Sequence, residues 1–371
     1  MSVLIICEKP SVAKTVALAL GAAEQKDGYL SGDGLLVSWC IGHLISMADA
    51  GSYDERYKKW RYEDLPILPQ TWKYAPTPGK EKQLAVLKEL LHRSDVSEVV
   101  NGCDAGREGE LIFRFVYEQA GCTKPFSRLW ISSMEDSAIR EGFAGRRAGT
   151  EYDALYQSAL CRARADWLVG INATRLFSVL YHKTLNVGRV LSPTLNLLVE
   201  RDGKITMFHK EKYHIVHIGC GGVDAESERI SDASAADALK TACEASQAVC
   251  VSLKKEKKTA LPPKLFDLTL LQREANRVYG FTAKQTLDYA QSLYEKRFLT
   301  YPRTDSNYLT EDMAQTATDL VAALLPVLPF MQGAELTPEI GRVINSAKVS
   351  DHHAIIPTAA FAGNGFDGLP E

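Results

Sequence analysis

The 371-residue sequence predicts a multidomain α/β protein that begins with a parallel sheet covered by helices and continues with mainly helical parts. Three observations support this fold class. Short apolar runs alternate with helical patterns over residues 1–150, helical patterns dominate from residue 151, and strand-like runs return between residues 212 and 262.

The first alternation starts at the N-terminus. VLIIC predicts a buried strand, and PSVAKTVALAL, after Glu8 and Lys9, predicts a helix. KEKQLAVLKELLHRS predicts a second helix and EVVNGC a second buried strand. DAGREGELIFRFVYEQAG predicts a tight turn and a helix that ends at Gly121, and FSRLWI and MEDSAIREGF continue the pattern. Strands joined through helices form parallel sheets, so residues 1–150 are expected to form one domain.

Helices and one small β element follow. Residues 152–181 predict a long helix that carries Arg162, Arg164 and Arg175. KYHIVHIGC (212–220) and QAVCVSLKK (247–255) predict strands on either side of a short alanine-rich helix, and KKEKKTALPPK predicts a charged linker. FDLTLLQREANRVYG and AKQTLDYAQSLYEK predict helices that lead into LTYPRTDS.

Composition narrows the function classes. The formal net charge of −3 argues against binding a polyanion through overall charge, although it allows a local basic groove. The apolar runs are too short to cross a bilayer, and the N-terminus has no secretory signal pattern. The eight cysteines form no CxxC pair, which favours reduced thiols and a cytoplasmic location. No GxxxxGK[ST] motif is present, so no nucleotide cofactor is expected.

Acidic residues follow both predicted buried strands. Glu8 comes after VLIIC, Asp104 after EVVNGC, and Glu108 begins the next helix. Ends of parallel strands meet at one edge of a sheet, and three carboxylates there suit Mg²⁺. Lys9 and Arg107 would bind phosphate oxygens, aided by the helix N-terminus. The alternative is that the acids cap helices and complement a helix dipole, which explains either stretch alone better than both together.

Two later motifs carry reactive side chains. In LTYPRTDS, Arg303 is placed to bind an anion beside the phenol of Tyr301, as suits a tyrosine that attacks phosphorus. The alternative is that Pro302 ends a helix and Tyr301 packs in a core. DHHAIIPT contributes His352 and His353, which alone are a weak metal signal.

Together these motifs resemble those of the type IA DNA topoisomerases, most closely the topoisomerase III branch. EKPSVAK and DAGREGELIF are similar to the TOPRIM motifs, and SALCRARADWLVGINATR and NVGRVLSPTLNLLVERD to the helical single-strand-binding domain. LTYPRTDS and DHHAIIPT are similar to the catalytic-tyrosine and histidine motifs. The resemblance implies four parts: a Rossmann-like TOPRIM domain (1–150), the first part of a helical DNA-binding domain (151–211), the first part of a β arch (212–262) and a helical domain with the catalytic tyrosine (263–371).

The resemblance also implies a reaction, which is ATP-independent cleavage and resealing of single-stranded DNA with strand passage. Tyr301 would form a 5′-phosphotyrosyl link, and Arg303 would steady the phosphate. Glu8 and Lys9 would manage protons and charge at the leaving 3′-oxygen, and His352 fits the active-site histidine of the family. The implied Mg²⁺ ligands are Glu8, Asp104 and Glu108. The implied DNA-binding residues are Arg162, Arg164, Arg175 and Arg189, with an Arg162–Asp166 pair as the alternative for the first.

The sequence departs from the family pattern in two motifs. Gly106 stands where the DxDxE motif has its middle acid, so weak Mg²⁺ binding is expected. Glu110 is a candidate replacement, although on a helix it should point away from Glu108. Leu191 stands where glutamine is usual. The sequence ends soon after DHHAIIPT, so the return segments of the family's ring are expected to be missing, with weak cleavage and little relaxation as the consequence.

Two other functions stay open at this point. A TOPRIM nuclease or primase would explain the three acids but gives LTYPRTDS no role. A catalytically impaired single-stranded-DNA-binding remnant is the other alternative. Covalent capture of DNA by Tyr301 would separate all three.

Overall fold

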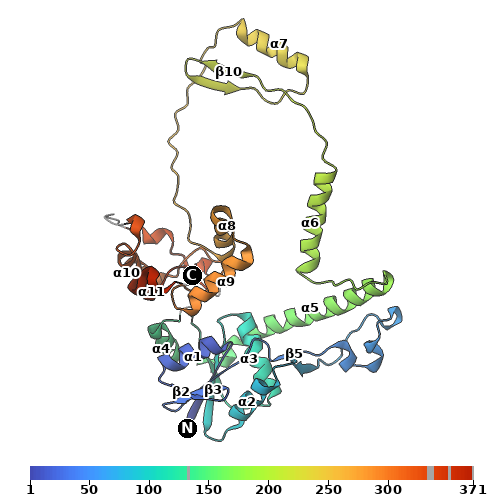
Figure 1. Ribbon diagram of the computed structural model, residues 1–371, viewed down its shortest axis with the longest axis vertical. Helices are drawn as coiled ribbons and strands as arrows, with labels where there is room; N and C mark the ends of the chain where they lie inside the picture. The colour runs from blue at the N-terminus through green and yellow to red at the C-terminus, as the bar shows by residue number, and fades with distance from the viewer. Residues whose placement is uncertain (132–133, 332–337, 350–351, 370–371) are drawn as a thin grey trace. The chain divides into compact units, whose positions relative to one another are not determined.

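The computed structural model describes residues 1–131, 134–331, 338–349 and 352–369, so Asp351 of the predicted histidine motif lies outside the described residues. The chain divides into two compact units (Figure 1). The first comprises Met1–Gly188 together with Pro263–Glu371, and the second comprises Arg189–Pro262. The four-part division expected from the sequence stays a prediction.

A seven-stranded sheet is the centre of the N-terminal part, with the strand order β2-β3-β4-β1-β7-β8-β9. Strand β1 (Ser2–Cys7) pairs in parallel with β4 (Leu35–Trp39) and β7 (Val96–Gly102), and β7 pairs in parallel with β8 (Phe126–Arg128). Antiparallel pairing occurs toward both edges: β3 (Tyr29–Gly32) pairs with β4 and with the edge strand β2 (Glu24–Lys26), and the other edge strand, β9 (Arg147–Ala148), pairs with β8. The predicted α/β fold class is confirmed, with antiparallel edges added to the parallel centre.

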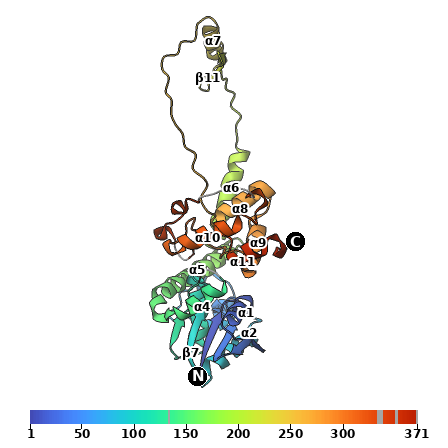
Figure 2. The same ribbon diagram turned by 90° about the vertical axis from the view of Figure 1, so that its left-hand side faces the viewer.

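Helices cover both faces of this sheet (Figure 2). Leu4 and Ile6 of β1 pack in a core with α2 (Glu81–His92) and α3 (Arg107–Gln119). Ile5 and Cys7 pack in the opposite core with α1 (Pro10–Ala19) and α4 (Asp136–Ala144). Successive side chains of a strand point to opposite faces, so a strand buried on both faces needs the continuous apolar run that the sequence shows.

The chain between β5 (Ile45–Met47) and β6 (Tyr74–Pro76), residues 48–73, is here called the excursion. It packs against the long helix α5 (Asp153–Leu180). The excursion contains the short helices η1 (Ala50–Ser52), η2 (Glu55–Lys58) and η3 (Tyr62–Asp64). Trp167 donates a hydrogen bond to the Ala48 carbonyl (2.9 Å). The Asn172 amide bonds to both the N–H (2.6 Å) and the carbonyl (3.0 Å) of Ile67.

The C-terminal part of the first unit is helical. It contains α8 (Leu268–Tyr279), α9 (Ala283–Glu295), α10 (Ala314–Leu324) and α11 (Ala359–Asn364). The side chain of Asp267 caps α8, and Thr282 and Gln285 form a capping box at α9, which confirms the two predicted helices. Thr300 donates its N–H to the Ile356 carbonyl (3.0 Å), so the segment before Tyr301 is bonded to the histidine motif.

The second unit contains α6 (Leu191–Thr206), the hairpin of β10 (His217–Cys220) and β11 (Val223–Glu226), and α7 (Ala233–Glu244). The alanine-rich helix is confirmed as α7. The strand predicted over residues 247–255 is wrong, because that stretch has no regular secondary structure. Gly221 and Gly222 both have positive φ and form a two-residue turn, so β10 finds its partner immediately downstream.

Candidate functional site

Two parallel strand ends bring Glu8 and Asp104 to the same edge of the sheet. Cys7 of β1 is in register with Gly102 of β7, and the two acids follow these strands. Burial, followed by the charge of Asp104, raises the pKa of Glu8 to about 7. The two carboxylates are therefore close enough to repel each other, as the rule for parallel strand ends predicts.

Tyr301 reaches this edge from the C-terminal part of the chain. Its hydroxyl donates a hydrogen bond to Oδ2 of Asp104 (3.0 Å), and Nζ of Lys9 lies 3.7 Å from the same oxygen. Burial, followed by the charge of Asp104, raises the pKa of the Tyr301 phenol, whereas the exposed Arg303 acts in the opposite direction. Tyr301, Asp104, Lys9, Glu8 and Arg303 thus form one electrostatically connected group.

Two rings fix the position of the Tyr301 side chain. Tyr294 of α9, which is buried, lies edge-on with ring centroids 5.3 Å apart. The His352 ring also contacts the Tyr301 ring, at a tilt, with centroids 4.4 Å apart. Burial lowers the pKa of His352 to about 4, so this ring is neutral at physiological pH. His353 instead places Nδ1 2.8 Å from the Ala354 carbonyl oxygen.

The turn that carries Asp104 is held by a buried arginine that the sequence analysis did not select. Arg128, 1% exposed, donates hydrogen bonds to the carbonyls of Asn101 (3.1 Å), Cys103 (2.7 Å) and Asp104 (2.7 Å). Its Nε lies 2.7 Å from Oε1 of Glu110, which is equally buried. Glu110 is therefore the counter-ion of Arg128. The Glu110 side chain points away from Glu108, as expected for these positions on a helix, and so does not reach the exposed edge.

Glu108 lies at the exposed side of the site. Its carboxylate is 3.5 Å from Nε2 of His43 and 3.9 Å from Nη1 of Arg162. His43 was not predicted, although it follows β4, the other parallel neighbour of β1, and the rule for strand ends applied to β4 would have found it. Among the described residues, no three His, Cys, Asp or Glu side chains are grouped to hold a metal, so the metal site stays a prediction.

The other predicted DNA-binding arginines lie farther along the chain. Arg164 donates to the Tyr74 hydroxyl (3.2 Å) and lies over the Trp72 ring. Arg175 is 8% exposed, donates to the Tyr57 carbonyl (2.8 Å) and lies over Trp60. Arg189 is the first residue of the second unit. Their contact with DNA stays a prediction.

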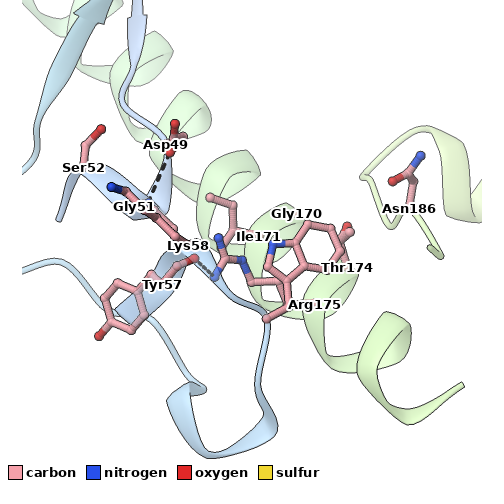
Figure 3. A pocket seen from close by; sticks show the side chains of 12 residues that line it. Asp49, Gly51, Ser52, Tyr57, Lys58, Gly170, Ile171, Thr174, Arg175 and Asn186 are labelled. Carbon is pink, nitrogen blue, oxygen red and sulfur yellow. Dashed lines mark hydrogen bonds between the residues drawn. The ribbon is translucent and has the colours of Figure 1, made fainter. Parts of the chain in front are cut away.

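A cavity of about 690 Å³ lies where α5 meets the excursion. Figure 3 shows the guanidinium of Arg175 beside Tyr57 and Lys58, with Asn186 across from them. The lining residues are Asp49, Ala50, Gly51, Ser52, Tyr57, Lys58, Trp60, Gly170, Ile171, Thr174, Arg175 and Asn186. Basic, amide and aromatic side chains therefore line this cavity together.

The sheet with acidic strand ends belongs to a known class of domain. Residues 3–134 match the model of the Toprim domain, a metal-binding domain. Residues 150–366 match the family model described as DNA topoisomerase, and the chain belongs to this family.

Similar proteins agree with this assignment. The chain is 42% identical over 369 residues to a DNA topoisomerase 3 of Shouchella clausii, covering 95% of this chain and 50% of the relative. It is 41% identical over 368 residues to DNA topoisomerase 3 of Bacillus subtilis, covering 96% and 50%. The chain thus spans about half the length of these relatives. The full-length topoisomerase I of Thermotoga maritima has the same fold, with a TM-score of 0.68, 24% identity and coverage of 99% of this chain and 57% of the other. The predicted resemblance to the topoisomerase III branch of the type IA enzymes is confirmed.

Proposed function

We propose that this chain cleaves and reseals single-stranded DNA through a covalent bond to Tyr301, as a topoisomerase III-like enzyme of type IA. The observation that carries the proposal is the 3.0 Å hydrogen bond between the Tyr301 hydroxyl and Asp104. This bond joins a tyrosine of the helical part to the acidic strand end of the Toprim domain. A nuclease or primase built on the same acids would have no use for that contact.

The chemistry follows from the positions of these groups. The Tyr301 oxygen bonds to a backbone phosphorus while the bond from phosphorus to the 3′-oxygen breaks, so one ester replaces another and no ATP is needed. The phenolic proton passes to Asp104, the acceptor of its hydrogen bond. Glu8, with a pKa of about 7, supplies a proton to the leaving 3′-oxygen, and Lys9 adds positive charge there. Resealing reverses each transfer.

We further propose Mg²⁺ as the metal. Glu8 and Asp104 would hold a hard cation once Glu8 has given up its proton, because a positive ion nearby would relieve the repulsion between the two carboxylates. Glu108 is the third donor, and its contacts with His43 and Arg162 hold it at the edge of this site. When bound, the ion supplies positive charge beside the phosphate. The residue at 106 is glycine, so binding is expected to be weak.

The substrate strand is proposed to run along α5. Arg162, half-buried beside Glu108, is the arginine of this helix nearest the acidic group and is proposed to bind a phosphate. Arg164 and Arg175 lie over aromatic rings, and cationic and aromatic groups in alternation suit the phosphates and bases of a single strand. No described helix is long and apolar enough to cross a membrane. The eight unpaired cysteines support a cytoplasmic location.

The test is covalent capture of DNA. End-labelled single-stranded oligonucleotides are incubated with the chain, quenched with denaturant and separated by size. We expect an adduct on the 5′ side of the nick that Tyr301→Phe abolishes. The matched control is Tyr308→Phe, a half-buried tyrosine of the same segment. Nicking without an adduct would indicate a nuclease, and binding without either product a DNA-binding remnant. An adduct that survives in Tyr301→Phe would refute the proposal.

A further inference from the structure

Arg297 has a backbone conformation that is unusual for its residue type. It follows α9 with a φ of 66°. Its N–H donates to the Tyr294 carbonyl (2.8 Å), and the N–H of Phe298 donates to the Leu293 carbonyl (2.8 Å). These two bonds close a Schellman motif, in which the left-handed residue is usually glycine. The arginine therefore carries a backbone penalty that glycine would avoid.

The side chain of Arg297 contacts the Toprim domain. Its Nη1 lies 2.5 Å from Oδ1 of Asp136, the first residue of α4. The preceding residue, Glu135, accepts a hydrogen bond from the N–H of Ala359 at the start of α11 (3.1 Å). Thr358 donates its hydroxyl to the Arg297 carbonyl and so ties these two contacts together. The beginning of α4 is thus bonded twice to the part of the chain that carries Tyr301.

The surface around these bonds is incompletely filled. A cavity of about 490 Å³ lies between α4 and the helical part, lined on one side by Glu135, Ala138 and Glu141. Leu320 of α10 and Pro357 are on the other side. Side chains do not fill this space, so packing beside α4 is incomplete there, although Tyr294 of α9 is buried in the core that contains Ile139 of α4. The polar contacts at the start of α4 act in addition to that core packing.

We propose that Arg297 and Asp136 are positioning residues for the reaction of Tyr301. Their ion pair fixes the segment four residues before Tyr301 against α4 and so keeps the phenol at Asp104. Both side chains are partly exposed, at 29% and 49%, so the pair is weak enough to break when the two parts separate. This inference rests on the proposed function of Tyr301.

The experiment compares the unaltered chain with two single variants, Arg297→Gly and Asp136→Asn. A double variant, the reversed pair, combines Arg297→Asp and Asp136→Arg so that the two charges exchange places. The initial rate of adduct formation is measured against DNA concentration in about 20 mM and about 500 mM salt, since screening weakens exposed pairs. We expect each substitution alone to slow the saturated rate roughly two- to fivefold in low salt. The difference in rate between each single variant and the unaltered chain should shrink in high salt. The half-saturating DNA concentration should stay constant, and the reversed pair should recover part of the lost rate.

A second readout separates positioning from folding. Glycine relieves the strained backbone, so the thermal midpoint of Arg297→Gly should rise or stay constant while its adduct rate falls. The control is Arg277→Gln, which breaks an ion pair with Glu274 inside α8 and should leave the rate unchanged. Equal rates for Arg297→Gly and the unaltered chain, or no recovery in the reversed pair, would overturn the inference.

Failure of the proposed function would look different, because the unaltered chain would then form no adduct at all. In that case hydrogen exchange of residues 298–301 tests the ion pair directly. Faster exchange in Arg297→Gly, with recovery in the reversed pair, would support the positioning contact. Unchanged exchange would overturn it.

Discussion

Replacing Glu110 by glutamine should destabilise the Toprim domain strongly, because this acid is a buried counter-ion. It is 1% exposed, pairs with Arg128 (2.7 Å) and accepts a hydrogen bond from Asn101 (2.9 Å). Removing one partner of a buried ion pair costs about 3–5 kcal/mol. Two effects favour the lower end of this range. Burial raises the pKa of Glu110, so the folded state already destabilises its charge, and the amide oxygen of glutamine can still accept a hydrogen bond. We therefore expect about 3 kcal/mol, or a midpoint lowered by about 6–12 °C.

Thermal unfolding followed by circular dichroism measures this loss. Glu108→Gln is the matched control, since it changes an acid on the same helix whose side chain is 56% exposed and should cost less than about 1 kcal/mol. Binding of Mg²⁺ is measured on both variants. If Glu110 instead replaced the missing acid of the metal site, Glu110→Gln would weaken Mg²⁺ binding and leave the midpoint nearly unchanged. That result would refute the counter-ion role.

Three further predictions follow from the same structure. Gly106→Asp should lower the Mg²⁺ concentration for half-maximal resealing. The control, Gly106→Asn, caps α3 equally well and should leave that concentration unchanged. Equal Mg²⁺ concentrations for the two variants would mean that the extra carboxylate is irrelevant. Burial lowers the pKa of His353, so below about pH 6.5 the unfolded state binds a proton more readily than the folded state does, and the free energy of unfolding should fall. Chemical denaturation should show that the free energy of unfolding depends less on pH in His353→Gln. Asn172→Ala removes two hydrogen bonds to Ile67 and should speed proteolysis of residues 48–73, while the exposed Asn186→Ala should not.

The sequence predicts best those features that local patterns determine. The run VLIIC is apolar throughout because β1 is buried on both faces, and its parallel pairing with β7 makes the meeting of Glu8 and Asp104 a direct consequence. His43 and Arg128 were missed because their roles depend on which strands become neighbours. The strand expected over residues 247–255 was wrong because strand propensity does not specify a partner, and β10 pairs with the nearer β11.

The arginines of α5 illustrate why a motif alone does not assign a role. Trp167, Asn172 and Arg175 all bond to the backbone of the excursion, so this part of a sequence typical of DNA binding also maintains the local structure. Arg162 occupies a different position, beside the acid at the start of α3. Loss of DNA binding in an Arg175 variant would therefore combine a lost contact with a displaced loop. The same measurement at Arg162 would report mainly on charge beside Glu108, where the reacting phosphate is proposed to lie.

The surroundings of Tyr301, the proposed nucleophile, keep its phenol protonated. Burial and the charge of Asp104 both raise the pKa of Tyr301, so the phenol keeps its proton and is a weak nucleophile. Arg303 is the positive group that acts against this shift, and it is exposed where a phosphate can approach. A phosphate held by Arg303 would take part of its charge, so attack then depends on transfer of the phenolic proton to Asp104. In the proposed reaction, Asp104 is therefore the group that must accept the phenolic proton when the Tyr301 oxygen attacks.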